Sequence, residues 1–296
     1  MIELRHLTKK FGSVSAVNDL NAKIKSGEVL SIIGQNGAGK TTTFRMLLGF
    51  INADSGSIIW DNNIDKKNRR IITGFLPEER GLYQKWSIRE QIVYLSKLHG
   101  MSKKDSIIEL KKCMHRLQVV GEIDDKIQSL SKGNAQKVQF ISTIIFKPKI
   151  LILDEPFTGL DPLNSEIIMK EILNLKKKGV AIVFSSHDMS GVEKISDKII
   201  MLNKGNCVLS GTPKNIRNSF GNTEIYIESD ISNDEIMRIK GVKNIQNLKD
   251  IRRIQLSNPR AGKDVFNLLS RKGYIKQFSQ QPPTLNEIFK YKAKEL

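Results

Sequence analysis

The sequence lacks any apolar run long enough to cross a membrane. A membrane-spanning helix needs about 20 consecutive apolar residues, whereas the longest apolar runs here, at residues 149–154 and 180–184, have the length of single strands. The first residues, Met1-Ile2-Glu3-Leu4-Arg5, also lack the apolar core of a signal peptide. We therefore expect a chain that stays in the cytosol and cannot span a membrane by itself.

Cysteine is scarce as well. The chain has two cysteines, Cys113 and Cys207, which lie far apart and form no C-x-x-C pair. This spacing excludes a disulfide framework and a cysteine-based metal site. Two isolated thiols suit a reducing compartment.

The composition is otherwise that of a folded protein. The 296 residues (33.5 kDa) leave room for one large and one small domain. Hydrophobic residues make up 39% of the chain and charged residues 27%, so extensive disorder is excluded.

Acidic residues are outnumbered by basic ones. The chain has 48 Lys and Arg against 31 Asp and Glu, a formal net charge of +17. Such an excess can indicate that the partner is a nucleic acid or an anionic membrane surface. The excess is spread over the chain, however, and its longest clusters, Lys66-Lys67-Asn68-Arg69-Arg70 and Lys176-Lys177-Lys178, are short. We favour a solvated basic surface, and an anionic partner stays open.

Short apolar runs alternate with helical periods, which predicts an α/β fold. Residues 87–120 instead have helical spacing throughout, and they predict a helical insert at about residues 82–130. Gly211-Thr212-Pro213 indicates a boundary, so we expect one domain at residues 1–215 and an accessory domain at residues 216–296. The second domain has the predicted order β-α-β-β-α-β, which suggests a small α+β, ferredoxin-like unit.

The strongest local motif is Gly34-Gln35-Asn36-Gly37-Ala38-Gly39-Lys40-Thr41, which matches G-x-x-x-x-G-K-[ST]. It lies between a predicted buried strand, Val29–Ile33, and a predicted helix at residues 40–50. In such a loop the backbone N–H groups and the helix N-terminus surround a polyphosphate. The lysine reaches the β- and γ-phosphates, and the threonine hydroxyl can bind Mg²⁺. The nucleotide-binding residues predicted here are Gly34, Asn36, Gly37, Ala38, Gly39, Lys40, Thr41 and Thr42.

A second motif is the apolar strand Ile150–Leu153, which ends in Asp154 and Glu155. Acids at a strand end are common and are often just solvated. Beside a phosphate-binding loop, however, Asp154 is placed to hold Mg²⁺ and Glu155 to polarise an attacking water. The two motifs together predict an enzyme that hydrolyses a nucleoside triphosphate.

Further segments follow in a recognisable order. Leu130-Ser131-Lys132-Gly133-Asn134 occupies the place of an LSGGQ signature, Gly159-Leu160-Asp161 resembles a D-loop, and His187 follows a predicted strand. With these motifs, residues 1–215 resemble the nucleotide-binding subunit of an ATP-binding cassette (ABC) transporter. The resemblance implies a P-loop ABC nucleotide-binding domain with an α/β core, an antiparallel β subdomain and a helical subdomain.

The resemblance also implies how the site works. It assigns ATP and Mg²⁺ as cofactors, Glu155 and His187 as catalytic residues, and Phe11 as the ring that stacks on adenine. Ser131 and Gly133 would contact the ATP of a second protomer, and Asp161 would lie at that interface. Phe11 could instead be an ordinary strand residue and His187 a polar strand end, but we favour adenine stacking for Phe11 and a γ-phosphate contact for His187. Asp161 also suits the N-cap of a helix and can serve in both ways.

The family context further implies partners. Two protomers, either identical or related, would enclose two ATP molecules and drive a separate integral membrane subunit from the cytoplasmic face of the membrane. The insert at residues 82–130, with Glu78 at its base, is the expected docking face. The segment Pro77-Glu78-Glu79-Arg80-Gly81-Leu82-Tyr83 resembles an exporter-type subgroup that often carries a C-terminal domain.

Three residues depart from the family pattern. Glu78 stands where the family has a glutamine that senses Mg²⁺, and as a carboxylate it can still serve as a metal ligand. Lys132 and Asn134 replace a glycine and a glutamine of the signature. Ser131 and Gly133 are retained, so activity is expected, although not necessarily at the usual rate.

Two other functions remain as alternatives. Some proteins with this cassette act on ribosomes or nucleic acid, but those usually have two cassettes or long coiled coils, and neither is present. Nucleic acid is therefore the less favoured partner. A cassette that binds ATP without hydrolysing it is disfavoured because Glu155 and His187 are both present. Residues 216–296 offer no catalytic group, and their role in stability, regulation or partner contact is left open.

Overall fold

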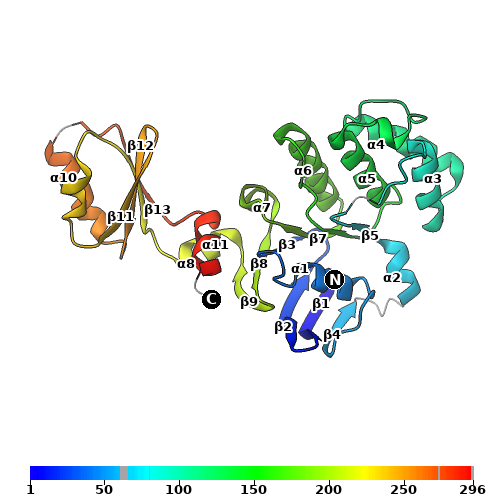
Figure 1. Ribbon diagram of the computed structural model, residues 1–296, viewed down its shortest axis with the longest axis horizontal. Helices are drawn as coiled ribbons and strands as arrows, with labels where there is room; N and C mark the ends of the chain where they lie inside the picture. The colour runs from blue at the N-terminus through cyan, green and yellow to red at the C-terminus, as the bar shows by residue number, and fades with distance from the viewer. Residues whose placement is uncertain (61–65, 80, 273, 295–296) are drawn as a thin grey trace. The chain divides into compact units, whose positions relative to one another are not determined.

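The computed structural model describes residues 1–60, 66–79, 81–272 and 274–294 (Figure 1). The chain divides into two units, Met1–Ser210 and Gly211–Glu295, each with its own core. From the sequence we placed the domain boundary between residues 215 and 216. Among the described residues, no helix has the length and apolar character that crossing a bilayer requires.

The first unit alternates strands and helices. Its elements are β1 (Ile2–Phe11), β2 (Val14–Ile24), β3 (Val29–Ile33), α1 (Lys40–Leu47), β4 (Ser55–Trp60), α2 (Lys66–Ile72), β5 (Thr73–Leu76), α3 (Ile88–Leu98), α4 (Lys103–Arg116), the 3₁₀ helix η2 (Ile127–Ser129), α5 (Lys132–Ile144), β6 (Ile150–Leu153), α6 (Pro162–Lys177), β7 (Ala181–Ser186), α7 (Met189–Ile195), β8 (Lys198–Asn203) and β9 (Asn206–Gly211).

In the described part of this unit, nine strands form one sheet in the order β4-β1-β2-β9-β8-β3-β7-β6-β5. The strands from β8 to β5 are parallel, whereas β4, β1 and β2 pair antiparallel. Figure 1 shows the antiparallel strands at one end of the unit and α3, α4 and α5 at the other. This arrangement confirms the predicted α/β core with an antiparallel β part and a helical part.

The central strands are buried on both faces, as continuous apolar runs require. Every residue of β3, β6 and β7 is buried, and α1 adds Phe44 and Leu47 to the same core. The register pairs Leu153 of β6 with Phe184 of β7, and Ile33 of β3 with Ser186 of β7. The loops that follow β3, β6 and β7 therefore leave the sheet at one common edge.

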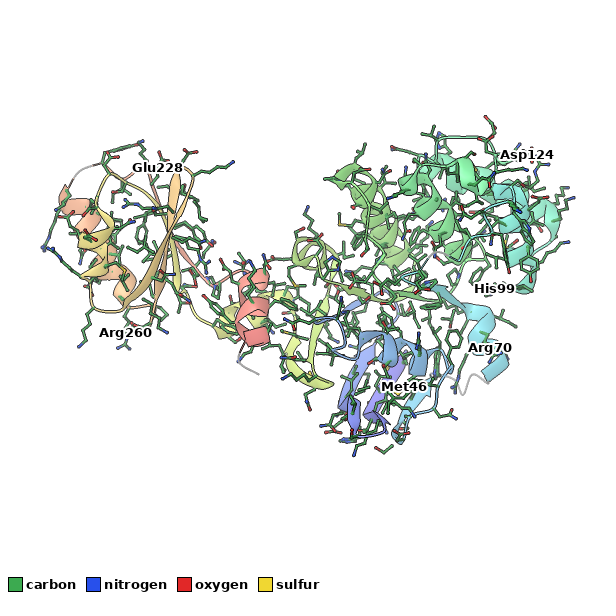
Figure 2. The ribbon with its side chains drawn as sticks, viewed as in Figure 1. Met46, Arg70, His99, Asp124, Glu228 and Arg260 are labelled. Carbon is green, nitrogen blue, oxygen red and sulfur yellow. The ribbon has the colours of Figure 1, made fainter. Side chains whose placement is uncertain are left out.

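The helices α3 and α4 of the helical part each begin with a serine N-cap. Ser87 forms a reciprocal capping box with Glu90 at the start of α3, which the sequence analysis did not identify. The spacing of Ser102 and Asp105 in the sequence predicts a capping box at the next helix, and α4 begins with these bonds: the Ser102 hydroxyl accepts the Asp105 N–H and donates to the Asp105 carboxylate. His99, at the end of α3, stacks on Phe146 and lies between the helical part and α2 (Figure 2).

Some local predictions were wrong. We expected a strand over residues 71–76, but α2 continues to Ile72 and β5 begins at Thr73. The helix has basic residues and only a terminal isoleucine pair, so it has no apolar period to reveal it. The short helices α7 and α8 were also missed, because one or two turns show no periodicity, and so was the hairpin strand β9.

The second unit has the predicted β-α-β-β-α-β order. Its elements are α8 (Pro213–Ser219), β10 (Glu224–Glu228), α9 (Asn233–Met237), β11 (Val242–Leu248), β12 (Ile251–Leu256), α10 (Ala261–Lys272), β13 (Gln277–Gln281) and α11 (Leu285–Lys294). In the described residues the strands form an antiparallel sheet in the order β11-β12-β10-β13. This order is ferredoxin-like, as predicted. The last strand was expected at residues 275–278, and β13 begins two residues later.

Candidate nucleotide-binding and catalytic site

The glycines of the loop between β3 and α1 are required by its geometry. Gly37 and Gly39 have φ angles of +79° and +108°, and Gly39 is the N-cap of α1. A Cβ at Gly39 would lie 2.3 Å from the Ala16 carbonyl oxygen, and one at Gly34 would lie 2.4 Å from the Leu202 carbonyl oxygen. The loop thus packs tightly on β2 and β8 at its base, while its tip at Asn36 is exposed.

Lys40 is buried at the start of α1. Its ammonium group donates to the Gly34 carbonyl oxygen at 2.9 Å and to the Gln35 carbonyl oxygen at 3.3 Å. It also lies 3.9 Å from a carboxylate oxygen of Glu155. The positive charge is therefore held inside the loop at the N-terminus of a helix, an arrangement suited to an anion.

Asp154 follows β6 and is 3% exposed. One of its carboxylate oxygens accepts a hydrogen bond from the Thr41 hydroxyl at 3.0 Å, and the other accepts one from the Ser185 hydroxyl at 2.6 Å. The two loops predicted to share a metal ion are thus in direct contact. A carboxylate and a hydroxyl are hard oxygen donors of the type that Mg²⁺ prefers.

Glu155 has a left-handed backbone, with a φ angle of +49°. Its N–H donates to the Ser185 hydroxyl at 2.8 Å. One of its carboxylate oxygens lies 2.8 Å from His187 Nδ1 and accepts the His187 N–H at 3.3 Å. The glutamate side chain is buried, whereas the histidine side chain is 68% exposed, so His187 lies at the open side of the pair.

A second group of predicted residues lies at the starts of α5 and α6. Ser131 caps α5, and Asp161 caps α6 by accepting the Asn164 N–H at 2.9 Å. A Cβ on Gly133 would lie 2.8 Å from Asn164 Nδ2, so the signature segment (residues 130–134) packs against the first turn of α6. The hydrogen bonds from the Asn164 N–H and side chain keep the pKa of Asp161 below its usual value.

Two of the predicted site residues, Phe11 and Glu78, lie at the edge of this region. Phe11 ends β1 and is 53% exposed, and Lys9 Nζ lies 5.5 Å from the centroid of its ring. Glu78 is exposed beyond β5, two residues after Leu76, whose carbonyl oxygen accepts the Asp154 N–H at 2.8 Å. The Glu78 segment therefore begins beside the acidic strand end.

The structure thus brings Lys40, Thr41, Asp154, Glu155 and His187 into one connected cluster, which we call the acid–lysine cluster. Gly133 and Asp161 form a separate group around Asn164, and Ser131 lies two residues before Gly133 at the start of α5. Sequence reasoning missed Ser185 and Asn164. The buried serine near the end of the predicted strand at residues 180–185 was the available signal for the first. The sequence offered no such signal for Asn164.

Comparison with known proteins assigns the family. A model of the ABC transporter family matches residues 17–158, and a model of the C-terminal domain of DrrA1-3-like ATP-binding proteins matches residues 211–293. The chain is 40% identical to the uncharacterized ABC transporter ATP-binding protein YhaQ of Bacillus subtilis strain 168, over 98% of this chain and 97% of that one. The chain belongs to the ABC transporter ATP-binding proteins.

Other relatives are more distant. The linearmycin resistance ATP-binding protein LnrL of Bacillus subtilis strain 168 is 25% identical over 85% of this chain and 81% of its own length. The spermidine/putrescine import ATP-binding protein PotA of Clostridium acetobutylicum is 31% identical over 74% of this chain and 63% of its own length. Relatives named for resistance and for import are therefore both similar to this chain.

Solved structures of cassettes support the same assignment. An ATP-binding subunit of an ABC transporter has a TM-score of 0.68 and 26% identity over 75% of this chain and 93% of that one. The dimeric cassette MJ0796, bound to ADP and Pi after hydrolysis, has a TM-score of 0.64 and 25% identity over 72% of this chain and 98% of that one. This ABC protein binds ATP and is the ATP-hydrolysing subunit of a transporter.

Proposed function

We propose that the acid–lysine cluster is the ATP hydrolysis site and that each of its residues has the role predicted for it. The observation that carries this proposal is the contact between three loops: Thr41 bonds Asp154, and Lys40 and His187 both approach Glu155. The loop residues from Gly34 to Thr42 would hold the phosphates, with Lys40 exchanging its backbone partners for phosphate oxygens. Phe11 would stack on adenine.

The donor set also fits Mg²⁺. Thr41 and Asp154 offer two oxygen donors, and the described residues contain no cluster of three or more His, Cys, Asp or Glu that could hold a metal alone. This is the pattern of Mg²⁺ sites in which substrate phosphates complete the coordination. Thr41 and Asp154 would hold the ion, with Glu78 as a further candidate ligand. When bound, Mg²⁺ neutralises charge on the phosphates.

Glu155 would act as the general base. Its carboxylate is buried and held by His187, so it has a fixed direction, as a base that orients water needs. His187, which is mostly exposed, would also reach the γ-phosphate. The Lys40 ammonium lies 3.9 Å from the other oxygen of the Glu155 carboxylate.

The group around Asn164 would serve a second protomer. Ser131 and Gly133 would meet ATP bound to the other copy, and Asp161 would lie at the same interface. One cassette carries one loop and one signature segment, so a two-fold dimer of this chain, or of this chain with a related subunit, completes two sites. The dimeric state of MJ0796 in its solved structure supports this arrangement.

We further propose that the dimer drives an integral membrane subunit at the cytoplasmic face of the membrane. The described insert presents an aromatic cluster formed by Tyr83, Trp86 and Tyr94, with ring centroids 4.6 and 5.4 Å apart. Tyr83 and Tyr94 are about half exposed, as expected for part of a docking face. Export is favoured because LnrL, which is named for resistance, aligns over more of both chains than PotA, which is named for import.

The decisive variant is Glu155→Gln. Losing the base should reduce ATP turnover by about 100-fold or more, while ATP binding and ATP-dependent dimerisation persist. Steady-state phosphate release and analytical ultracentrifugation measure the two effects. Glu3→Gln, on β1 and away from the cluster, is the matched control and should behave as the parent chain.

The same variant identifies the partner. Tagged Glu155→Gln protein, recovered from its native membranes with ATP and Mg²⁺, should carry a polytopic membrane protein in near-equal amount. Recovery of ribosomes or nucleic acid without such a protein would contradict the transport role.

A further inference from the structure

Ser185 lies near the end of β7, the middle strand of the parallel part of the sheet, between the strands that precede the two functional loops. β7 pairs with β3 on one side and with β6 on the other. The register pairs Ser185 with Ile32 of β3, and it pairs Phe184 with Leu153, so the next residue on each strand places Ser185 beside Asp154. The serine is fully buried, and it is therefore not placed to touch a nucleotide.

The Ser185 hydroxyl makes two hydrogen bonds of opposite sense. It donates its proton to Asp154 at 2.6 Å and accepts the Glu155 N–H at 2.8 Å. A hydroxyl has one proton and two lone pairs, so it can make both bonds at once. One buried atom thereby bridges two neighbouring acids that are proposed to have different tasks.

Each bond constrains one acid. The first holds one Asp154 oxygen, which leaves the other directed at Thr41. The second satisfies the N–H of Glu155, whose backbone has the uncommon φ angle of +49°. That backbone directs the Glu155 carboxylate to His187. Removing the hydroxyl would release the carboxylate of Asp154 and leave the buried N–H of Glu155 without this acceptor.

We propose that Ser185 is a positioning residue for ATP hydrolysis, which sets the metal-binding carboxylate and the catalytic glutamate relative to each other. This inference rests on the proposed function of the acid–lysine cluster and adds a residue to it. Groups that orient metal ligands in this way typically change metal affinity or activity by about 10- to 100-fold when removed.

Neighbouring serines have other partners and provide controls. Ser186 accepts the Asp188 N–H at 3.0 Å and stabilises the turn before α7. Ser31, on β3, is also fully buried and its hydroxyl bonds Ser196, outside the cluster. Ser31→Ala therefore removes a comparable buried hydroxyl from the same sheet without touching either acid.

The first test compares Ser185→Ala with Ser31→Ala in ATP turnover. For Ser185→Ala we expect kcat to fall by about 10- to 100-fold, with a rise in the Mg²⁺ concentration that gives half-maximal rate. ATP affinity measured in EDTA should stay that of the parent chain, because the phosphate-binding loop is unchanged. Ser31→Ala should match the parent in all three quantities.

A second measurement does not depend on turnover. Glu155→Gln protein is loaded with ATP and Mn²⁺, passed over a desalting column, and its retained Mn²⁺ is measured by electron paramagnetic resonance. Adding Ser185→Ala should reduce the retained Mn²⁺ by about tenfold or more, whereas adding Ser31→Ala should not. Equal retention in both double variants would overturn the proposal.

A matched pair of variants covers the case in which Ser185→Ala does not fold. Ser185→Thr and Ser185→Val have the same shape and differ only in one hydroxyl. The threonine variant should reach half-maximal rate at the same Mg²⁺ concentration as the parent. The valine variant should need a higher Mg²⁺ concentration. If both behave alike, the hydroxyl has no positioning role.

These outcomes separate the two proposals. If Glu155→Gln leaves turnover intact, the proposed hydrolysis site is wrong. If Glu155→Gln abolishes turnover and Ser185→Ala leaves turnover and Mn²⁺ retention unchanged, only the role of Ser185 is wrong.

Discussion

At the scale of single residues, the phosphate-binding loop depends on positions that only glycine can occupy. Gly39 combines a φ angle of +108° with a carbonyl oxygen 2.3 Å from where its Cβ would be. Any side chain there must displace the backbone of β2 or the start of α1. The loop shape is therefore fixed before a nucleotide binds, which reduces the entropy lost on binding.

We predict that Gly39→Ala weakens ATP binding strongly and also costs about 1–3 kcal/mol of stability, since both the φ angle and the close contact are unfavourable. Isothermal titration with ATP and urea unfolding measure the two effects. Gly81→Ala is the control, because a Cβ at Gly81 meets nothing within 4 Å. Parent-like ATP affinity in Gly39→Ala would contradict the described loop geometry.

At the scale of elements, α11 is attached to its sheet by polar groups. Glu287 of α11 lies 2.8 Å from Arg253 of β12, and Arg253 also bonds Glu224 of β10 at 2.8 Å. Glu224 is fully buried, and one of its carboxylate oxygens has no partner among the described atoms. Burial raises the pKa of Glu224, although Arg253 opposes the shift.

This environment predicts that the contribution of Glu224 to the free energy of unfolding depends on pH. A raised pKa in the folded state means that Glu224 stabilises the fold most below its unfolded pKa of 4.5, and that this contribution is lost as the pH rises through the folded value. The free energy of unfolding of Glu224→Gln, minus that of the parent, should therefore increase with pH. Urea unfolding followed by circular dichroism at about pH 4 to 8 measures this difference.

The control for this prediction lies on the same strand. Glu228 is less buried, and its carboxylate bonds Lys276 at 2.9 Å. Glu228→Gln should show no comparable rise with pH. A flat difference for Glu224→Gln would mean that the Glu224 carboxylate is not desolvated as described.

The sequence predicted elements well where the apolar period was long or alternation was regular. Strands were expected at residues 224–228, 242–248 and 251–256 and a helix at residues 261–272, and β10, β11, β12 and α10 have these bounds. The buried strands around the site were recognised from continuous apolar runs. α2 was missed because its residues show no apolar stripe, and short helices such as α7 have too few turns to show a period.

Site residues that belong to local sequence motifs could be predicted, whereas those outside such motifs could not. Lys40, Asp154 and Glu155 belong to contiguous patterns, so their residue types and spacing sufficed. Ser185 and Asn164 act through neighbours that are distant in sequence, and only the register of β6 with β7 and the packing of α5 on α6 reveal them. Pairing between strands is set by tertiary structure, which spacing along the chain does not encode.

At the scale of the whole molecule, the acid–lysine cluster lies entirely within the first unit, which has its own core. We therefore propose that residues 1–215 fold and bind ATP without the rest of the chain. The truncated chain should show the ATP affinity of the full chain, measured by isothermal titration. If it aggregates or fails to bind ATP, the second unit is needed for the fold of the first.

The aromatic cluster of the insert has one further consequence. The chain has two tryptophans, Trp60 and Trp86, and Trp86 is half-buried beside two tyrosines on the proposed docking face. Trp60 lies on β4, with the Arg69 guanidinium 5.2 Å from its ring centroid. Replacing Trp60 with phenylalanine would leave Trp86 as the single indole fluorophore. The native sequence thus carries an optical reporter at the place where the membrane subunit is proposed to arrive.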